Sequence, residues 1–364
     1  MLSIAHLIAT NRGRGAEKFA LALAESLSKF ELKQNIVVIR SYGAARNRGG
    51  VPEVPMYFRR PPFPTLIWEA LAFRYVLNQR KPDIVLCHGL RTAKVARIAC
   101  LFMRRRPVLV MKKIGMTSDW VRTNKAMRNA FSRWVLRGLS LIIVLGPSQL
   151  RELTEVFGQP ERKIACIPNG RPLRTASNIR HDPAKIVFVG SLEPEKGPDV
   201  ALRVLKGVLA RAPSASLHFL GEGSLRTQLE EEASALGIRD SVEFRGHVED
   251  VSVELHSAAA MLISSRTEGV PGVAIEAAMA GLPVVSWDVG DVAAVVADGV
   301  SGVLVKRGDE DALSAALWEV ISNDRWHQSH SRGARERSSM FDIDVISQAY
   351  MKIFNELSSV AATK

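Results

Sequence analysis

The chain has 364 residues, of which 47% are hydrophobic types, and a formal net charge of +12. It is long enough for two domains with separate cores and too apolar to be disordered. No apolar run approaches the roughly 18 residues of a membrane-spanning helix. The three cysteines, Cys87, Cys100 and Cys166, show neither a metal-binding nor a disulfide spacing, and they indicate a reducing cytoplasm.

Charge is distributed unevenly along the chain. Residues 1–172 hold 30 Lys and Arg against 10 Asp and Glu, whereas residues 173–364 hold 19 against 27. The first half is therefore strongly basic and the second mildly acidic. This asymmetry predicts a polyanion, a phosphorylated substrate or an anionic membrane beside the first half.

Short apolar runs alternate with longer amphipathic segments in the first half, a pattern typical of a parallel sheet covered by helices. The predicted strands are Ser3–Ile8, Asn35–Ile39, Asp83–Cys87, Val108–Met111, Leu141–Val144 and Lys163–Ile167. Predicted helices include Ala16–Lys29, Pro64–Gln79 and Thr92–Met103.

The segment Val121–Leu139 of this half is basic and amphipathic. It carries Arg122, Lys125 and Arg128 together with Phe131 and Trp134. Such a helix suits the surface of an anionic membrane, which is the role we expect. The alternative is a solvated face packed by the two aromatic side chains.

A second series of strands and helices follows the turn-forming residues 168–172. Its predicted strands are Lys185–Val189, Ser216–Leu220, Val242–Arg245, Ala260–Ser264, Pro283–Ser286 and Gly302–Val305. Its predicted helices include Asp199–Arg211, Leu225–Leu236, Val273–Ala280 and Asp309–Asn323. We therefore predict two Rossmann-like α/β domains, residues 1–172 and 173–342, followed by a helical segment, residues 343–364.

The segment 264–285 is the most informative part of the second half. A strand is followed by a loop with Glu268, and a helix then begins near Pro271 and ends at Gly281. Small residues leave the first amides of this helix open to an anion. Glu268 and Glu276 are suited to accept hydrogen bonds from sugar hydroxyls, although a helix start also favours carboxylates for its dipole alone.

These residues resemble a known family. Glu268 and Glu276 form the E-x7-E pattern, within E-G-x-P-x4-E-A-x-A-x-G-x-P-V-V, of retaining GT-B glycosyltransferases of family four (glycosyl transferases group 1). Further motifs of that family are matched at Arg14–Glu17, Asp83–Gly89, Ile167–Gly170, Gly190–Gly197, Leu220–Leu225 and Phe244–Val248. The resemblance implies the GT-B fold: two Rossmann-like parallel-sheet domains facing a cleft, with the C-terminal helix crossing back to the first domain.

The resemblance also implies roles for individual residues. Glu276 would hold the ribose hydroxyls of the donor, and Glu268 those of the donor sugar. His88 would face the reacting centre, and Lys196 would neutralise the diphosphate. Other residues implied in donor binding are Gly15, Gly190, Ser191, Gly221, Gly223, His247, Val248, Gly269, Val270, Pro271, Gly272 and Val273. Arg14, Arg122, Lys125 and Arg128 would lie on the acceptor or membrane side.

The sequence departs from the family pattern at several positions. Ser191 stands where the family has a second basic partner of the diphosphate, and Arg14 replaces the first glycine of G-G-x-E. Asp291 and Ala294 replace a later glycine and glutamate. Lys196, Arg266 or an arginine of the first domain would then supply the missing charge.

Together these features predict a retaining, metal-independent glycosyltransferase with no cofactor and a UDP- or GDP-sugar as donor. The expected acceptor is a glycan or a lipid-linked glycan, in the synthesis of a cell-surface polysaccharide or lipopolysaccharide. The enzyme would be cytoplasmic and peripheral at the inner face of the plasma membrane.

Two alternatives remain open. The first is a family-four enzyme with a small soluble acceptor, and the second is a catalytically idle GT-B-like protein that binds a membrane or a polyanion. We expect no nucleic-acid partner, because the basic half lacks interleaved aromatic residues that stack on bases. The donor base, the sugar, the acceptor and the oligomeric state are not determined by the sequence.

Overall fold

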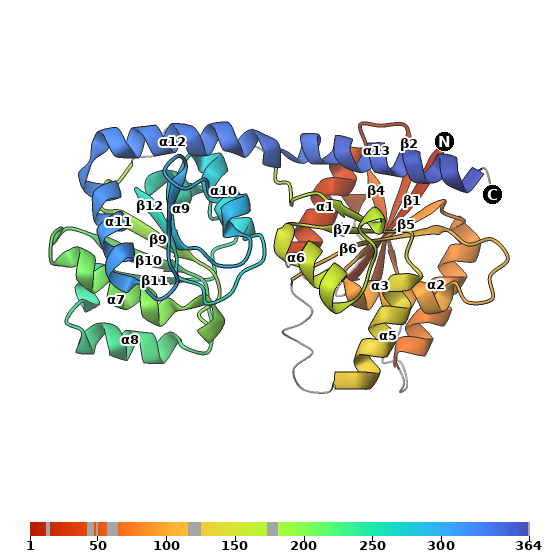
Figure 1. The fold of residues 1–364 in the computed structure, drawn as a ribbon, viewed down its shortest axis with the longest axis horizontal. Coiled ribbons are helices and arrows are strands. Elements are labelled where there is room, and N and C mark those ends of the chain that lie inside the picture. Colours follow the sequence, from red (N-terminus) through yellow and green to blue (C-terminus); the bar gives the residue numbers. More distant parts are fainter. Residues whose placement is uncertain are drawn as a thin grey trace. The chain divides into compact units, whose positions relative to one another are not determined.

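The computed structural model describes residues 1–11, 15–41, 47–48, 50–56, 65–115, 125–172 and 181–362, with the backbone alone for 47–48, 125–129 and 360–362. The chain forms two compact units (Figure 1). Unit 1 contains Met1–Pro172 and Asp342–Lys364, and unit 2 contains Leu173–Phe341. Each unit is built on a largely parallel sheet with helices, so the predicted fold class is confirmed.

Unit 1 holds an eight-stranded sheet in the order β3-β4-β2-β1-β5-β6-β7-β8. The strands are β1 (Leu2–Thr10), β2 (Leu32–Arg40), β3 (Asn47–Arg48), β4 (Val51–Pro55), β5 (Ile84–His88), β6 (Val108–Lys112), β7 (Leu141–Val144) and β8 (Ile164–Cys166). Strand β4 escapes prediction because Pro52 and Pro55 weaken its strand signal. Since β1 pairs with both β2 and β5, the winding of the sheet reverses between β1 and β5. Ligands of such sheets bind at this point, beyond the carboxyl ends of the strands.

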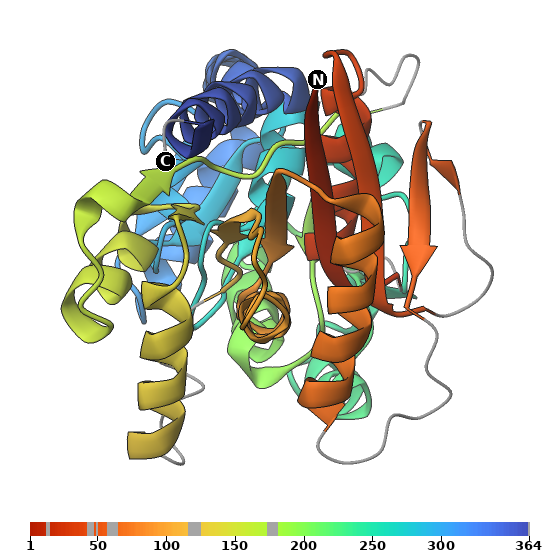
Figure 2. The ribbon, with the colours of Figure 1, turned by 90° about the vertical axis from the view of Figure 1, so that its right-hand side faces the viewer.

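Helices cover both faces of this sheet. They are α1 (Gly15–Leu27), α2 (Thr65–Arg80), α3 (Leu90–Ala99), α5 (Lys125–Arg137), α6 (Pro147–Arg151), which continues into one turn of π-helix at Glu152–Val156, and α13 (Ile343–Ala362). Figure 2 shows α3 between α2 and α5, in agreement with its contacts to both. The core under these three helices includes Phe73, and the core on the other face includes Phe19 and Tyr350.

The C-terminal helix returns to unit 1, as predicted. α13 contacts α1 and β6. Its side chains Tyr350 and Phe354 are fully buried. Asp344 accepts hydrogen bonds from Ser26 Oγ at 2.7 Å and from Lys29 Nζ at 2.5 Å. The core of unit 1 is therefore completed by residues far from its strands in sequence.

Unit 2 holds a six-stranded sheet in the order β11-β10-β9-β12-β13-β14. The strands are β9 (Lys185–Val189), β10 (Ser216–Leu220), β11 (Val242–Gly246), β12 (Ala260–Ile263), β13 (Val284–Trp287) and β14 (Gly302–Val305). The helices are α7 (Pro198–Leu209), α8 (Arg226–Ala235), α9 (Ser252–Ser257), α10 (Gly272–Ala280), α11 (Glu310–Ser322) and α12 (Asp324–Ser338). β9 pairs with β10 and β12, so the winding reverses between β9 and β12.

Candidate active site

The loops that follow β9 and β12 meet at the carboxyl edge of the sheet in unit 2. Gly197, at the end of the first loop, has φ 64°, and a Cβ there would lie 2.2 Å from the carbonyl oxygen of Ser264 in the second loop. Ser264 Oγ donates to the carbonyl of Gly197 at 2.8 Å. Only glycine permits this approach, and it fixes the first loop against the second.

This junction brings Lys196 and Glu268 together. Lys196 Nζ lies 2.6 Å from Glu268 Oε1, which also accepts a hydrogen bond from Ser265 Oγ at 2.7 Å. Glu268 is mostly buried and Lys196 is partly exposed. The turn of Gly290 passes so close that a Cβ there would lie 1.9 Å from the Glu268 carbonyl oxygen. The ammonium and the carboxylate are therefore held at one point of the edge.

Helix α10 begins beside this pair. Pro271 precedes its first residue, Gly272, and no described side chain caps the helix. The free amides at such a helix start attract an anion. Glu276 is half-buried in the second turn of α10. Gly269 and Val273 flank the helix start and are also half-buried, and the side chain of Val270 is buried.

The predicted residues that follow β9 and β10 lie against one another. A Cβ on Gly221 would come within 1.9 Å of the Gly190 carbonyl oxygen, and one on Gly223 within 2.4 Å of the Leu192 carbonyl oxygen. Ser191 is exposed between them. His247 and Val248 follow β11, the next strand in the sheet. The structure thus gathers the predicted residues of unit 2 at one edge.

The sequence suggested Arg266 as a partner of the diphosphate, but in the structure Arg266 is paired with Asp199. Its Nη1 and Nη2 donate to the two carboxylate oxygens of Asp199 at 3.0 and 2.7 Å, and Nη1 also contacts the carbonyl of Pro194. Burial raises the pKa of Asp199, but the hydrogen bonds and charges of Arg266 and Arg203 outweigh it and lower the pKa overall. The guanidinium of Arg266 thus fastens the loop after β12 to the start of α7.

In unit 1, predicted residues lie where the sheet reverses. His88 is the last residue of β5, and Gly15 is the first residue of α1, which follows β1. Gly15 is exposed, and a Cβ there would meet nothing within 4 Å. Arg14 and Arg122 lie outside the described residues, and Lys125 and Arg128 belong to the part of α5 described by its backbone alone.

A chain of hydrogen bonds determines the protonated nitrogen of His88. Gln34 Nε2 donates to the Ala24 carbonyl at 3.1 Å, so Gln34 Oε1 accepts from His6 Nε2 at 3.0 Å. His6 Nδ1 is then an acceptor, and His88 Nε2 donates to it at 3.5 Å. This leaves the buried His88 Nδ1 as a bare acceptor with no partner among the described residues. His6 was not among the predicted site residues, yet it orients the candidate catalytic histidine.

The electrostatics agree with neutral imidazoles. Burial lowers the pKa of His6 to about 4 and, with the charges of His6 and Lys112, lowers the pKa of His88 well below its usual value. Lys112 is itself buried at the end of β6, with Nζ 4.0 Å from the centroid of the Phe19 ring. Burial and the charge of Arg171 lower the pKa of Lys112 to about 7. Sequence analysis missed Lys112, because a lysine in a strand gives no signal of its burial.

The aromatic residues expected on a membrane helix are engaged within unit 1. Phe131 and Trp134 of α5 stack with ring centroids 5.7 Å apart. Lys94 and Arg97 of α3 lie over the two rings, at 5.5 and 5.0 Å. Phe131 also packs against the core. These contacts favour the packed alternative for this part of α5.

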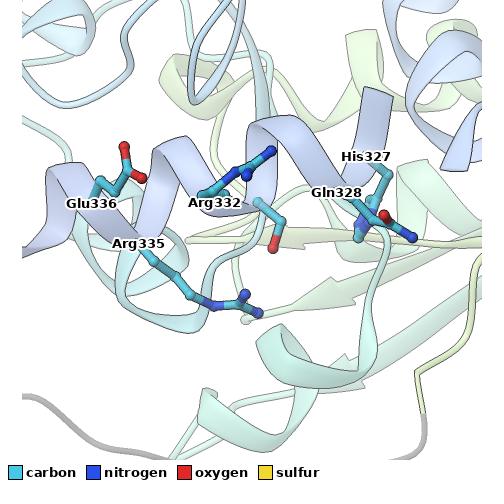
Figure 3. Close-up of a pocket in the computed structure, with 6 residues that line it drawn as sticks. His327, Gln328, Arg332, Arg335 and Glu336 are labelled. Carbon is cyan, nitrogen blue, oxygen red and sulfur yellow. The ribbon is translucent and has the colours of Figure 1, made fainter. Parts of the chain in front are cut away.

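A hollow of about 560 Å³ lies elsewhere in unit 2, beside α12 (Figure 3). It is lined by His327, Gln328, Ser331, Arg332, Arg335 and Glu336. Arg335 packs against Gly281 at the end of α10, because a Cβ on Gly281 would lie 2.4 Å from Arg335 Nε. The end of α10 is at the amino edge of the sheet, so this hollow is separate from the candidate active site.

Comparisons with known proteins agree with these observations. Residues 13–174 match the family model Glycosyltransferase Family 4, and residues 171–337 match Glycosyl transferases group 1. The glycogen synthase of Mycobacterium tuberculosis is 30% identical over 284 residues, which are 75% of this chain and 69% of that protein. The chain belongs to glycosyltransferase family 4.

Two further similarities extend along nearly the whole of this chain. The Campylobacter jejuni GalNAc-alpha-(1->4)-GalNAc-alpha-(1->3)-diNAcBac-PP-undecaprenol alpha-1,4-N-acetyl-D-galactosaminyltransferase is 25% identical, over 99% of this chain and 100% of that one. The structure of Anabaena Alr3699/HepE in complex with UDP has a TM-score of 0.82 at 17% identity, covering 98% of this chain and 100% of that one. The fold of the enzyme is GT-B, and its family transfers sugars with retention.

Two features of the family 4 enzyme complete the description. Among the described residues, no helix has both the length and the apolar character needed to cross a bilayer. In the same part of the chain, no group of three or more His, Cys, Asp or Glu side chains is placed to hold a metal ion.

Proposed function

We propose that this family 4 glycosyltransferase moves a sugar from a UDP- or GDP-sugar to a lipid-linked glycan that becomes part of a cell-surface polysaccharide or lipopolysaccharide. The observation that carries the proposal is the Lys196–Glu268 pair, 2.6 Å apart, beside the uncapped start of α10. The ammonium of Lys196 and the free amides of the helix start can bind the negative charge of a diphosphate. The carboxylate of Glu268 beside them can accept hydrogen bonds from sugar hydroxyls.

The donor would lie along the carboxyl edge of unit 2. Glu276 accepts hydrogen bonds from the ribose hydroxyls, and Glu268 accepts them from the donor sugar. The turns at Gly221–Gly223 and His247–Val248 flank the base. UDP in the structure of the Anabaena relative supports a uridine nucleotide, since that protein shares the fold over its whole length.

The leaving group takes negative charge as the bond from the sugar carbon to the phosphate oxygen breaks. Lys196 and the amides at the start of α10 stabilise that charge. Because Ser191 is neutral and Arg266 is bound to Asp199, Lys196 carries more of this work than in enzymes with two basic partners. His88, at the end of β5 in unit 1, keeps its buried Nδ1 as an acceptor, which suits a hydroxyl group of a substrate.

The acceptor is proposed from charge and from one relative. The name of the Campylobacter relative, which aligns with 99% of this chain, places its acceptor on PP-undecaprenol. The basic first half, with 30 Lys and Arg against 10 Asp and Glu, suits work beside anionic lipids. The enzyme would therefore be peripheral at the inner face of the plasma membrane, with Arg14, Arg122, Lys125 and Arg128 on that side.

A thermal-shift comparison of UDP, GDP and their sugars tests the donor site, since a ligand at a hundred times its Kd adds about 2.7 kcal/mol of stability. Glu276→Ala should weaken nucleotide binding by about 1.5–3 kcal/mol, because the ribose loses an ionised acceptor. Glu231→Ala, an exposed carboxylate on α8, is the matched control. Equal nucleotide affinity of Glu276→Ala and the parent would remove the ribose assignment.

Lys196→Ala tests the leaving-group role. We expect kcat to fall by two or more orders of magnitude, an estimate of about 3 kcal/mol, while KM changes little. Lys206→Ala, an exposed lysine on α7, should keep parental activity. Transfer to a polyprenyl diphosphate glycan, compared with transfer to a free sugar, separates the lipid-linked acceptor from a small soluble one. Nucleotide binding without any transfer would indicate the idle alternative.

A further inference from the structure

An apolar stripe runs along the outer side of α2 in unit 1. Ile67, Trp68, Leu71 and Tyr75 are all exposed, with Leu71 at 52% and Tyr75 at 67%. The positions recur three or four residues apart, so they share one side of the helix. The opposite side of α2 is also apolar, because Phe73 and Leu77 are buried in the core. A surface helix normally has a polar outer face, so this stripe is unusual.

A fifth residue, also aromatic, extends the stripe. Phe102, in the turn after α3, is 87% exposed. Arg74 of α2 donates a hydrogen bond to the carbonyl of Leu101 at 2.7 Å, so this turn lies against the part of α2 that carries Tyr75. We name the stripe of Ile67, Trp68, Leu71, Tyr75 and Phe102 the α2 face.

Backbone strain is concentrated beside the α2 face. Within the described part of the chain, the non-glycine residues with positive φ are Lys81, at 46°, and Phe102, at 59°. They follow α2 and α3, where helices usually have glycine or asparagine in this conformation. Arg105 joins the two turns through an ion pair with Asp83 at 3.0 Å. Phe102 thus has an exposed aromatic ring at a position where glycine would be less strained, which indicates that the ring has a function.

Charge around the α2 face is positive. Residues 65–106 contain nine Lys or Arg and two carboxylates. Both carboxylates are already paired with arginine, Asp83 with Arg105, and the buried Glu69 with Arg91 at 2.7 Å. The exposed cations Arg80, Lys81, Arg104 and Arg106 border the aromatic residues. Because both carboxylates of this segment are paired, the segment has little negative charge that would repel an anionic surface.

We infer that the α2 face docks the enzyme on an anionic lipid bilayer, with the aromatic side chains inserted among the headgroups and the bordering cations on lipid phosphates. Tryptophan and tyrosine favour this interface, and each nearby cation adds about 1 kcal/mol. The inference deepens the proposed function, because it names the surface that meets the membrane. It places that surface on α2 and the turn after α3. The aromatic rings of α5, in contrast, are engaged by cations of α3.

The position of α2 connects docking with the reaction. α2 precedes β5 and runs opposite to it, so the Thr65 end lies at the carboxyl edge of the sheet, where His88 ends β5. A helix lying flat on the bilayer therefore keeps the catalytic edge of unit 1 near the lipid surface. A lipid-linked acceptor would then reach that edge without leaving the membrane.

Co-sedimentation of the full chain with vesicles tests the inference. Vesicles of phosphatidylcholine alone are compared with vesicles of phosphatidylcholine and phosphatidylglycerol in equal parts. We expect binding to the anionic vesicles alone, weakening as the Debye length falls from about 10 Å at 0.1 M salt to 3 Å at 1 M. Trp68→Ser combined with Leu71→Ser should lower the partition coefficient by at least about tenfold.

Matched variants make the result specific. Val253→Asn combined with Val300→Asn removes two exposed apolar side chains of unit 2 and should leave the partition unchanged. Phe102→Gly should weaken partition without lowering Tm, because glycine adopts positive φ freely. Charge reversal of Arg122, Lys125 and Arg128 to Glu should release the protein less than the α2 variant does.

Several outcomes would overturn the docking surface. They are unchanged partition of the Trp68→Ser, Leu71→Ser variant, equal loss in the unit 2 control, or full release by the Arg122, Lys125, Arg128 reversal alone. Loss of a dimer in the α2 variant, with vesicle binding intact, would assign the stripe to a second copy of the chain. The thermal shifts with UDP and with GDP are measured in parallel, because the absence of both would contradict the proposed function and leave the vesicle result standing.

Discussion

At the scale of single residues, two hydrogen bonds determine the tautomer of the candidate histidine, His88. Gln34 on β2 accepts from His6 on β1, and His6 in turn accepts from Nε2 of His88 on β5, so that Nδ1 of His88 is left as an acceptor. The low pKa values of both imidazoles keep this arrangement neutral at physiological pH. A protonated His88 would present a donor at the same place and would reject a hydroxyl hydrogen.

Gln34→Leu should therefore disturb His88 without touching it. The substitution leaves the buried His6 Nε2–H unpaired, at a cost of about 1–3 kcal/mol, and lets both rings exchange tautomers. Gln34→Glu retains an acceptor at the same position and should keep the tautomer. Nitrogen NMR of the imidazoles would measure the tautomers of His6 and His88 directly. We expect kcat/KM to fall by up to about tenfold in Gln34→Leu and to stay at the parental value in Gln34→Glu. Identical His88 spectra in both variants would disprove the hydrogen-bond relay.

Lys112 gives a prediction of pH dependence. Its folded pKa is about 7 against an ordinary 10.5, so the folded protein loses this proton while the unfolded chain keeps it. Between those pH values the unfolded state binds more protons, and stability rises with pH. Lys112→Met should raise the free energy of unfolding by roughly 4–5 kcal/mol below pH 7, with the gain fading toward pH 10.5.

Denaturant titrations at about pH 6, 8 and 10 measure that slope. Lys206→Met, which replaces an exposed lysine on α7, should show no such gain. If Lys112→Met and the parent have parallel stability profiles across this range, then the ammonium of Lys112 is not held in a desolvated site.

At the scale of elements, the proposed donor site includes a close contact of two loops. Gly197→Ala would force a left-handed alanine and place its Cβ 2.2 Å from the Ser264 carbonyl oxygen. We expect a loss of more than about 2 kcal/mol of stability and a weaker affinity for UDP, because Lys196 would move with the loop. Calorimetry and nucleotide titration would measure both effects.

Gly237→Ala is the matched control for this variant. Gly237 has φ 73°, but a Cβ there would meet nothing within 4 Å. The change should therefore cost only the conformational strain, about 1 kcal/mol, and leave UDP binding intact. Equal effects of the two substitutions would mean that the contact between the loops is unimportant for the donor site.

The elements also show what sequence patterns can predict. Alternating apolar and amphipathic segments predicted the parallel sheets, because buried parallel strands have continuous apolar runs. Helix α12 was not predicted, since its 15 residues include Gly333 and a mainly polar surface with no clear apolar stripe. The exposed stripe of α2 was not recognised either, because its residues fit the apolar pattern of a buried helix. Of the predicted helix Val121–Leu139, the structure describes α5 at Lys125–Arg137, and residues 121–124 lie outside the described residues.

The site was predictable only where it is local in sequence. Glu268, Gly272 and Glu276 belong to one segment, and their motif suffices to mark them. The 2.6 Å contact of Lys196 with Glu268 spans 72 residues, and the approach of His88 to His6 spans 82. Such pairs depend on which strands are neighbours in the sheet, and a single sequence does not determine strand order. The roles of these residues in the reaction stay predictions.

At the scale of the whole molecule, the chain leaves unit 1, forms unit 2 and returns. Tyr350 of the returning helix is fully buried against Phe19 of α1, with ring centroids 6.2 Å apart. Tyr350→Ala should destabilise unit 1 by about 3–5 kcal/mol through the cavity it leaves. Calorimetry with UDP present should show the transition of unit 1 moving to lower temperature and that of unit 2 unchanged.

Tyr350→Phe is the control that separates packing from polarity. The buried hydroxyl of Tyr350 has no hydrogen-bond partner among the described residues, and burial raises its pKa. Removing it should leave stability unchanged or increase it, since a buried unpaired polar group is unfavourable. A loss as large as that of Tyr350→Ala would reveal a partner for the hydroxyl.

The return of α13 also sets an order of events on the ribosome. Unit 1 emerges first, but Phe354 and Tyr350 are translated only after Leu173–Phe341. At roughly 5–20 residues per second, that interval is on the order of ten to thirty seconds. Throughout it, the face of the first sheet that α1 and α13 cover together has only α1, and its remaining apolar surface is exposed to chaperones or to other nascent chains. Unit 2, the proposed donor-binding unit, can thus mature before unit 1, which precedes it in the gene.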